Sequence, residues 1–182
     1  MNYKEQYIAK MWAAIKETDI KGSFPSVIIA QGALESDWGR SSLAADYNNY
    51  FGIKAGSSWT GATVNKQTWE VFAAGTMNIA ANFRVYSSVE ASLKDRIAVL
   101  EKSYPSALSA SAPMDEIQAL KNGGYATATN YVSTVYSIIE TNNLTEYDIK
   151  FQNTMKATTT YSIFLVLGIF VAGLSVYKLL NK

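Results

Sequence analysis

The chain contains no cysteine and no histidine among its 182 residues. The absence of cysteine excludes disulfide bonds, thiol nucleophiles and cysteine-based zinc sites. The absence of histidine excludes Ser-His-Asp triads, Cys-His pairs and the usual zinc hydrolase sites, because each of them needs an imidazole. Carboxylates are therefore the expected agents of any acid–base chemistry near neutral pH.

Charge is also scarce, at 17% of residues, and the formal net charge is +1. No basic block with interleaved aromatic residues occurs, so we expect no nucleic-acid partner. Nothing in the sequence requires a metal ion or a cofactor. The length suits one domain of ordinary size plus an appendage.

Hydrophobic periodicity predicts a mostly helical domain over residues 1–142. The helix beginning at Pro25 is apolar around most of its circumference, which predicts the central, most buried helix. Two short runs rich in Thr, Val and aromatic residues, 66–71 and 82–86, predict a small antiparallel pair of strands. The expected fold class is therefore α+β, with further helices expected at 4–18, 41–47, 87–100, 114–121 and 129–141.

A run of 21 residues without charge, 157–177, follows the predicted domain. At about 1.5 Å per residue it would span roughly 30 Å, the hydrocarbon thickness of a bilayer. We therefore predict one C-terminal transmembrane helix over 157–180 that embeds the protein in a lipid bilayer. A buried core helix is the alternative. The polar segment 143–156 is predicted to be a linker.

The predicted membrane helix offers two weaker indications. Gly168 and Ala172 form a small-xxx-small pair that would allow helix–helix contacts in the membrane. Lys178 and Lys182 favour a cytoplasmic C-terminus, but the lysines before the segment leave the orientation open. No N-terminal export signal is visible, which suggests the membrane of a phage virion as one location and a bacterial envelope as the other.

Of the acidic side chains, Glu35 and Glu70 lie among apolar neighbours in the sequence. An apolar setting raises the pKa of a carboxyl group and keeps it protonated. Glycoside cleavage needs such an acid to protonate the leaving oxygen, together with a second group that stabilises the cation or activates water. Glu35 suits the first role and Glu70 the second. Most other acidic residues, Glu116 and Asp148 among them, are expected on solvated surface.

Four stretches of sequence resemble glycoside hydrolase family 73, the peptidoglycan β-N-acetylglucosaminidases. Residues 31–39, Gln-Gly-Ala-Leu-Glu-Ser-Asp-Trp-Gly, are similar to its Ala-Leu-Glu-Ser-Gly-Trp-Gly signature. Residues 49–54 resemble its Asn-x-Phe-Gly-x-Lys motif, and residues 83–88 its Phe-Arg-x-Tyr-x-Ser motif. Gly-Tyr-Ala-Thr at 124–127, followed by Tyr131, resembles its Gly-Tyr-Ala-Thr-Asp-Pro-x-Tyr motif.

This resemblance implies a lysozyme-like fold and hydrolysis of the β-1,4 bond between N-acetylglucosamine and N-acetylmuramic acid in peptidoglycan glycan strands. It carries the general acid onto Glu35 and a second, more variable carboxylate onto Glu70. It places substrate-binding or catalysis-supporting roles on a further set of residues: Tyr125, Tyr131, Gln31, Asn49 and Phe51.

The chain departs from the family pattern where Asp37 replaces Gly and where Ala128-Thr129 replaces Asp-Pro. The mechanism after protonation stays open between water activated by Glu70 and attack by the substrate's own acetamido group. Two other functions remain as alternatives. One is a lytic transglycosylase on the same fold, and the other is a non-catalytic glycan-binding or virion-structural protein tethered to a membrane.

Overall fold

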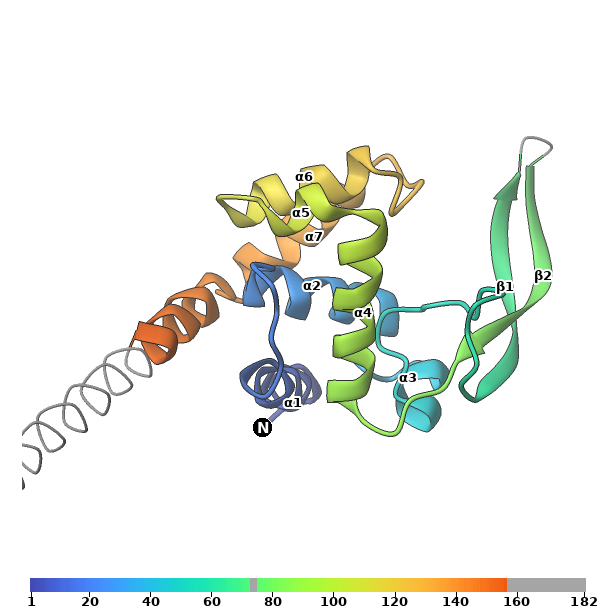
Figure 1. Cartoon of the computed structure of the whole chain (residues 1–182), viewed down its shortest axis with the longest axis horizontal. Coiled ribbons are helices and arrows are strands. Elements are labelled where there is room, and N and C mark those ends of the chain that lie inside the picture. Colours follow the sequence, from blue (N-terminus) through green and yellow to red (C-terminus); the bar gives the residue numbers. More distant parts are fainter. Residues whose placement is uncertain (73–74, 157–182) are drawn as a thin grey trace, which may run out of the picture.

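The computed structural model describes residues 1–72 and 75–156, without the side chains of 69–77. Most of it is a helical body from which an antiparallel hairpin projects, as Figure 1 shows. The fold is thus α+β and mostly helical, as predicted. In chain order the elements are α1 (Tyr3–Lys16), α2 (Pro25–Ser36), α3 (Ser42–Tyr47), β1 (Thr63–Phe72), β2 (Gly75–Arg84), α4 (Val89–Ser103), α5 (Pro105–Leu108), α6 (Pro113–Asn122) and α7 (Tyr131–Thr141).

Helix α2 is the centre of the body, as its apolar sequence predicted. Ten of its twelve residues are buried, and it packs against α1, α6 and α7. The two residues of α2 that reach the surface are Leu34 and Glu35, in its last turn. A helix buried along most of its length therefore surfaces at the carboxylate singled out from the sequence.

The N-terminus of α2 is capped by carboxylates from distant parts of the chain. Glu116 accepts a hydrogen bond from the backbone N–H of Phe24 at 2.7 Å, and Asp148 accepts one from that of Ser26 at 2.8 Å. Glu116 is fully buried and Asp148 is 8% exposed, so the expectation that both are solvated surface charges is wrong. Unpaired N–H groups and the positive end of the helix dipole stabilise these carboxylates.

The segment 143–156, predicted to be a linker, begins with residues that belong to the core. Leu144 is fully buried, residues 145–156 are helical, and the ring of Tyr147 packs edge-on against Trp12 with centroids 5.2 Å apart. The predicted membrane segment 157–180, including its Gly168 and Ala172 contact, lies outside the described residues. Within the described ranges, no helix combines the length and the apolar character needed to cross a bilayer.

The hairpin is longer than the two predicted strands. Its register runs from the pair Thr63 and Arg84 to the pair Phe72 and Gly75. Residues 75–81 of β2 were missed because Asn78, Ala80 and Ala81 have low strand propensity, which cross-strand pairing overrides here. At its base, Arg84 forms an ion pair with Asp95 of α4 at 2.7 Å, and the hydroxyl of Tyr86 donates to the same carboxylate at 2.6 Å. The motif at 83–88 therefore fastens the hairpin to the helical body.

Candidate active site

The sequence Glu-Ser-Asp-Trp-Gly forms a tight turn that ends α2. Asp37, Trp38 and Gly39 have consecutive left-handed conformations, with φ of 50°, 57° and 78°. The hydroxyl of Ser36 accepts a hydrogen bond from the N–H of Gly39 at 2.7 Å, which closes the turn. The chain therefore turns directly after the last helical turn, next to Glu35.

The departure at Asp37 fits this geometry. A left-handed φ favours glycine, but aspartate is among the few other residues that adopt it readily, because its short polar side chain bonds locally. Both carboxylate oxygens of Asp37 accept hydrogen bonds from the guanidinium of Arg40 at 2.9 Å. Asp37 therefore replaces the family glycine at a position where the backbone tolerates it, and its charge is paired outside the Glu35 pocket.

Glu35 opens onto a pocket of about 360 Å³ between α2, α4 and the loops after α3 and α6. A Cβ built on Gly52, whose φ is 62°, would lie 3.8 Å from Oε2 of Glu35. The loop backbone thus passes close beside the carboxylate. The residues that line the pocket are Glu35, Phe51, Gly52, Ile53, Lys54, Val99, Tyr104 and Tyr125.

The surroundings of Glu35 favour its protonated form. Its side chain is accessible to solvent, yet protein atoms crowd it closely, and this desolvation raises its pKa. Within the described part of the chain, Glu35 makes no hydrogen bond or ion pair that would offset the desolvation. A carboxylic acid whose pKa is raised in this way, at the edge of an open pocket, is suited to donate a proton to a ligand.

Phe51 and Tyr125, two of the residues predicted to contact substrate, line this pocket. Their contact with substrate stays a prediction. Phe51 is 3% exposed and forms part of the pocket wall. Tyr125 is half-buried and packs edge-on against Tyr104, with ring centroids 5.5 Å apart. Burial also raises the pKa of Tyr125, so its phenol remains a hydrogen-bond donor at any physiological pH.

Asn49 is not among the residues that line the pocket, and its role in substrate binding stays a prediction. It is 1% exposed, and its amide donates to the carbonyl groups of Ile53 and Arg84 at 2.9 Å. Its side-chain oxygen accepts from the N–H of Ile53 at 3.0 Å. Through these hydrogen bonds, Asn49 fixes the loop that contains Phe51 and joins this loop to the base of the hairpin.

Gln31 is likewise buried and bonded within the protein, and its predicted role in substrate binding is untested. It is fully buried, its amide donates to the hydroxyl of Tyr131, and its oxygen accepts from Arg96, with Nε 3.1 Å away. Tyr131 is itself 3% exposed. The centre of its ring lies 6.1 Å from that of Tyr125, so the two rings pack against each other.

Arg96 and Glu116 form a buried ion pair that sequence reasoning missed. The guanidinium of Arg96 lies 3.3 Å from Glu116, and both side chains are at most 1% exposed. Arg96 also stacks over the ring of Phe51 at 5.5 Å and bonds to Gln31. One signal was present in the sequence: Arg96 stands on the apolar stripe of its helix, three residues after Leu93.

Glu70, the predicted second carboxylate, lies on β1 opposite Met77, near the far end of the hairpin. Its side chain is outside the described part of the structure, and its role remains a prediction. Glu35 is the one carboxylate among the described residues that line its pocket. In the described residues, no cluster of three or more acidic side chains forms a metal site.

Comparison with known proteins agrees with the motifs. Residues 11–144 match the glucosaminidase family, described as mannosyl-glycoprotein endo-beta-N-acetylglucosaminidase. The exo-glucosaminidase LytG of Bacillus subtilis is 38% identical over 131 residues, which cover 68% of this chain and 46% of LytG. The peptidoglycan hydrolase FlgJ of Salmonella typhimurium is 36% identical over 120 residues, 63% of this chain and 38% of FlgJ.

The fold has a solved counterpart as well. The catalytic domain of the autolysin Auto from Listeria monocytogenes matches with a TM-score of 0.68 and 35% identity, covering 81% of this chain and 89% of that domain. The chain spans less than half the length of LytG and of FlgJ. Motifs, pocket and comparisons agree, and the chain belongs to the glucosaminidase family of glycoside hydrolases.

Proposed function

We propose that the protein hydrolyses the β-1,4 bond between N-acetylglucosamine and N-acetylmuramic acid in peptidoglycan, with Glu35 as the general acid. The observation that carries this proposal is the setting of Glu35. It is exposed to an open pocket, is not ion-paired within the described residues, and has a pKa raised by desolvation. LytG and FlgJ, whose names denote a glucosaminidase and a peptidoglycan hydrolase, support the choice of substrate.

In the proposed mechanism the proton of Glu35 passes to the bridging oxygen as the bond from that oxygen to the anomeric carbon breaks. The positive charge that develops on the sugar ring needs a partner on its opposite face. We place that role on Glu70 of the hairpin, which would take a proton from the attacking water with inversion of the anomeric carbon. Attack by the substrate's acetamido oxygen is the other route, and it would give retention.

The decisive experiment compares wild-type protein with the Glu35→Gln variant on purified peptidoglycan. Glutamine keeps the shape of the side chain but has no carboxyl proton to give. We expect the variant to lose about 10²–10⁴-fold in rate while it still sediments with the insoluble wall. A Glu140→Gln variant, changed at an exposed site on α7, should keep the wild-type rate. Wild-type protein that binds wall without cutting it would refute the proposal.

The chemical products separate the remaining alternatives. Hydrolysis gives reducing N-acetylglucosamine ends, whereas a lytic transglycosylase gives anhydro sugar ends, and mass spectrometry distinguishes the two. NMR of the first product formed reports its anomeric configuration. An inverted product, together with a large loss of rate in Glu70→Gln, supports Glu70 as the base. A retained product with little effect of that substitution refutes this role.

We also propose that residues 157–180 anchor the domain in a lipid bilayer, in a phage virion or a bacterial envelope. The support is the charge-free run of residues 157–177, long enough at about 1.5 Å per residue to span a membrane. The full chain should float with liposomes in a density gradient, and a Leu165→Arg/Leu167→Arg variant should not. Recovery of the wild-type chain with the soluble fraction would refute the anchor. Its presence in purified virions or in uninfected envelopes decides the location.

A further inference from the structure

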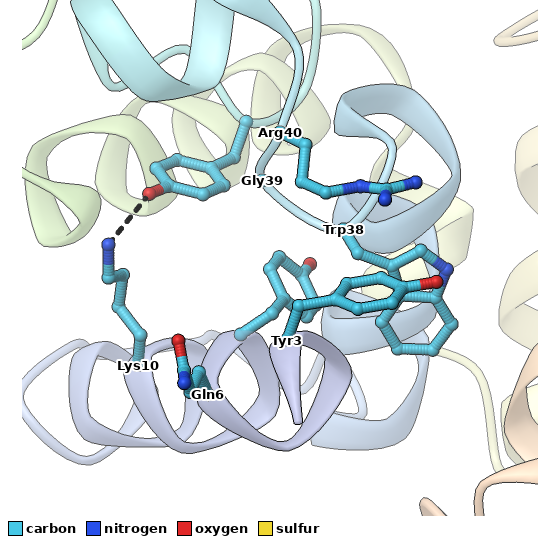
Figure 2. Close-up of a pocket in the computed structure, with 8 residues that line it drawn as sticks. Tyr3, Gln6, Lys10, Trp38, Gly39 and Arg40 are labelled. Atoms are coloured by element: carbon cyan, nitrogen blue, oxygen red, sulfur yellow. Dashed lines mark hydrogen bonds between the residues drawn. The ribbon is translucent and has the colours of Figure 1, made fainter. Parts of the chain in front are cut away.

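A second concavity lies on the other side of the turn that ends α2. It has a volume of about 200 Å³ and is formed by one face of α1 together with the Trp38–Arg40 turn and Tyr50. Figure 2 shows side chains from α1 along one side of it, facing those of the turn. We call it the Lys10 groove, and its lining residues are Tyr3, Gln6, Tyr7, Lys10, Trp38, Gly39, Arg40 and Tyr50.

The groove combines aromatic surface with positive charge. Four of its eight lining residues are aromatic, and none is acidic. Lys10 donates a long hydrogen bond of 3.5 Å to the hydroxyl of Tyr50, drawn as a dashed line in Figure 2. Lys4 lies at the rim, with its ammonium 4.8 Å from the centre of the Trp38 ring. In the described part of the chain, neither lysine has a carboxylate partner.

Arg40 is the third cation at the groove, and its contacts with neighbouring side chains are weak. It pairs with Asp37 and stacks over Tyr3 at 4.3 Å, but the side chains of Arg40 and Asp37 are 52% and 61% exposed. Exposed ion pairs of this kind contribute little and exchange easily with other anions. The groove and its rim therefore carry three cations against one carboxylate, over an aromatic surface.

This groove adjoins the Glu35 pocket. Tyr50 lines the groove and Phe51 lines the pocket, and consecutive Cα atoms are only about 3.8 Å apart. Glu35 in the last turn of α2 lines the pocket, and Trp38, three residues further along the chain, lines the groove. A polymer bound at Glu35 that carries side branches can therefore place a branch in the groove.

We propose that the Lys10 groove binds the stem peptide that peptidoglycan carries on its muramic acid residues, through a free carboxylate of that peptide. This inference rests on the proposed function. Where the lactyl carboxyl group of a muramic acid is joined to the stem peptide by an amide bond, the sugar carries no net charge. The stem peptide, in contrast, ends in carboxylates. Ammonium groups bind a carboxylate through charge-assisted hydrogen bonds, and the rings pack against the aliphatic part of the peptide.

The test compares two substrates and two variants of the full chain. The substrates are peptidoglycan with intact stem peptides and the same glycan after an amidase has removed them. The Lys10→Gln variant should lose about three- to tenfold in kcat/KM on the intact polymer and be unchanged on the stripped glycan. Lys16→Gln removes the same charge from the same helix outside the groove and should behave as wild type on both.

Two further readings make the result specific. Raising the salt concentration should shrink the difference between wild type and Lys10→Gln on the intact polymer, because exposed charges are screened. A soluble muramyl peptide should shift the indole N–H resonance of Trp38 in wild-type protein and shift it less in Lys10→Gln. A shift caused only by poly(glycerol phosphate), which offers phosphate in place of carboxylate, would overturn the assignment to the stem peptide.

The outcomes separate this inference from the proposed function. Wild-type protein that cleaves both glycans, with Lys10→Gln equally active or equally impaired on the two, overturns the groove and leaves the hydrolase standing. Wild-type protein that cleaves neither glycan overturns the proposed hydrolase and this inference with it.

Discussion

The buried ion pair between Arg96 and Glu116 gives the sharpest prediction about stability. One oxygen of Glu116 accepts from the hydroxyl of Ser23 at 2.5 Å and from Arg96 at 3.3 Å, and the other accepts from the N–H of Phe24 at 2.7 Å. All three partners are donors. In Glu116→Gln one oxygen becomes an NH₂ group, so at least one donor must face another donor.

The cost follows from this geometry. The substitution leaves the guanidinium of Arg96, 1% exposed, without its counter-charge and breaks at least one buried hydrogen bond. Removing one partner of a buried pair costs about 3–5 kcal/mol of unfolding free energy. For a chain of this length, each kcal/mol lowers Tm by about 2–4 °C. The variant should therefore melt roughly 6–20 °C below wild type.

Urea denaturation followed by circular dichroism measures this loss directly. Glu140→Gln, an exposed carboxylate on α7, is the matched control and should change the unfolding free energy by no more than about 0.5 kcal/mol. The double variant Arg96→Met/Glu116→Gln removes the unpaired charge as well and should recover part of the loss. A loss of less than about 1 kcal/mol in the unfolding free energy of Glu116→Gln would refute the reasoning.

Four further predictions concern the site and its supports. The pKa of Glu35 is raised above 4.5. The fall of kcat/KM with rising pH should therefore begin at a higher pH than the pKa of a free glutamate would give. A fall of kcat/KM centred near pH 4.5 would contradict the assignment. The same raised pKa means that ionised Glu35 opposes folding above it, so Glu35→Gln should raise Tm relative to wild type at pH 8 and not at pH 4. Asp148→Ala removes the cap on Ser26 and should cost about 0.5–2 kcal/mol in urea, an effect that a mere linker would not show. Tyr131→Phe leaves the buried amide of Gln31 without its acceptor and should cost about 1–3 kcal/mol; a neutral result would remove Tyr131 from the support of the site.

The sequence alone determined the helical body, its central helix and the carboxylate that we propose as the proton donor. The apolar run from Pro25 to Ala33 favours burial on all sides, and a carboxylate that follows such a run has to surface or be paired. The hairpin was also predictable in outline, because β-branched and aromatic residues gather in its first strand. These features depend on local composition and spacing, which a single sequence displays.

Only the tertiary structure decided which polar residues are buried. Glu116 and Asp148 looked like surface charges because their partners, the N–H groups of Phe24 and Ser26, lie about a hundred residues away in the chain. The hydrogen-bond partners of Gln31 and Asn49 could not be predicted for the same reason, since these bonds join segments that periodicity cannot bring together. Local pattern reports which face of an element is apolar, whereas the pairing of buried polar groups depends on contacts that exist only once the chain has folded.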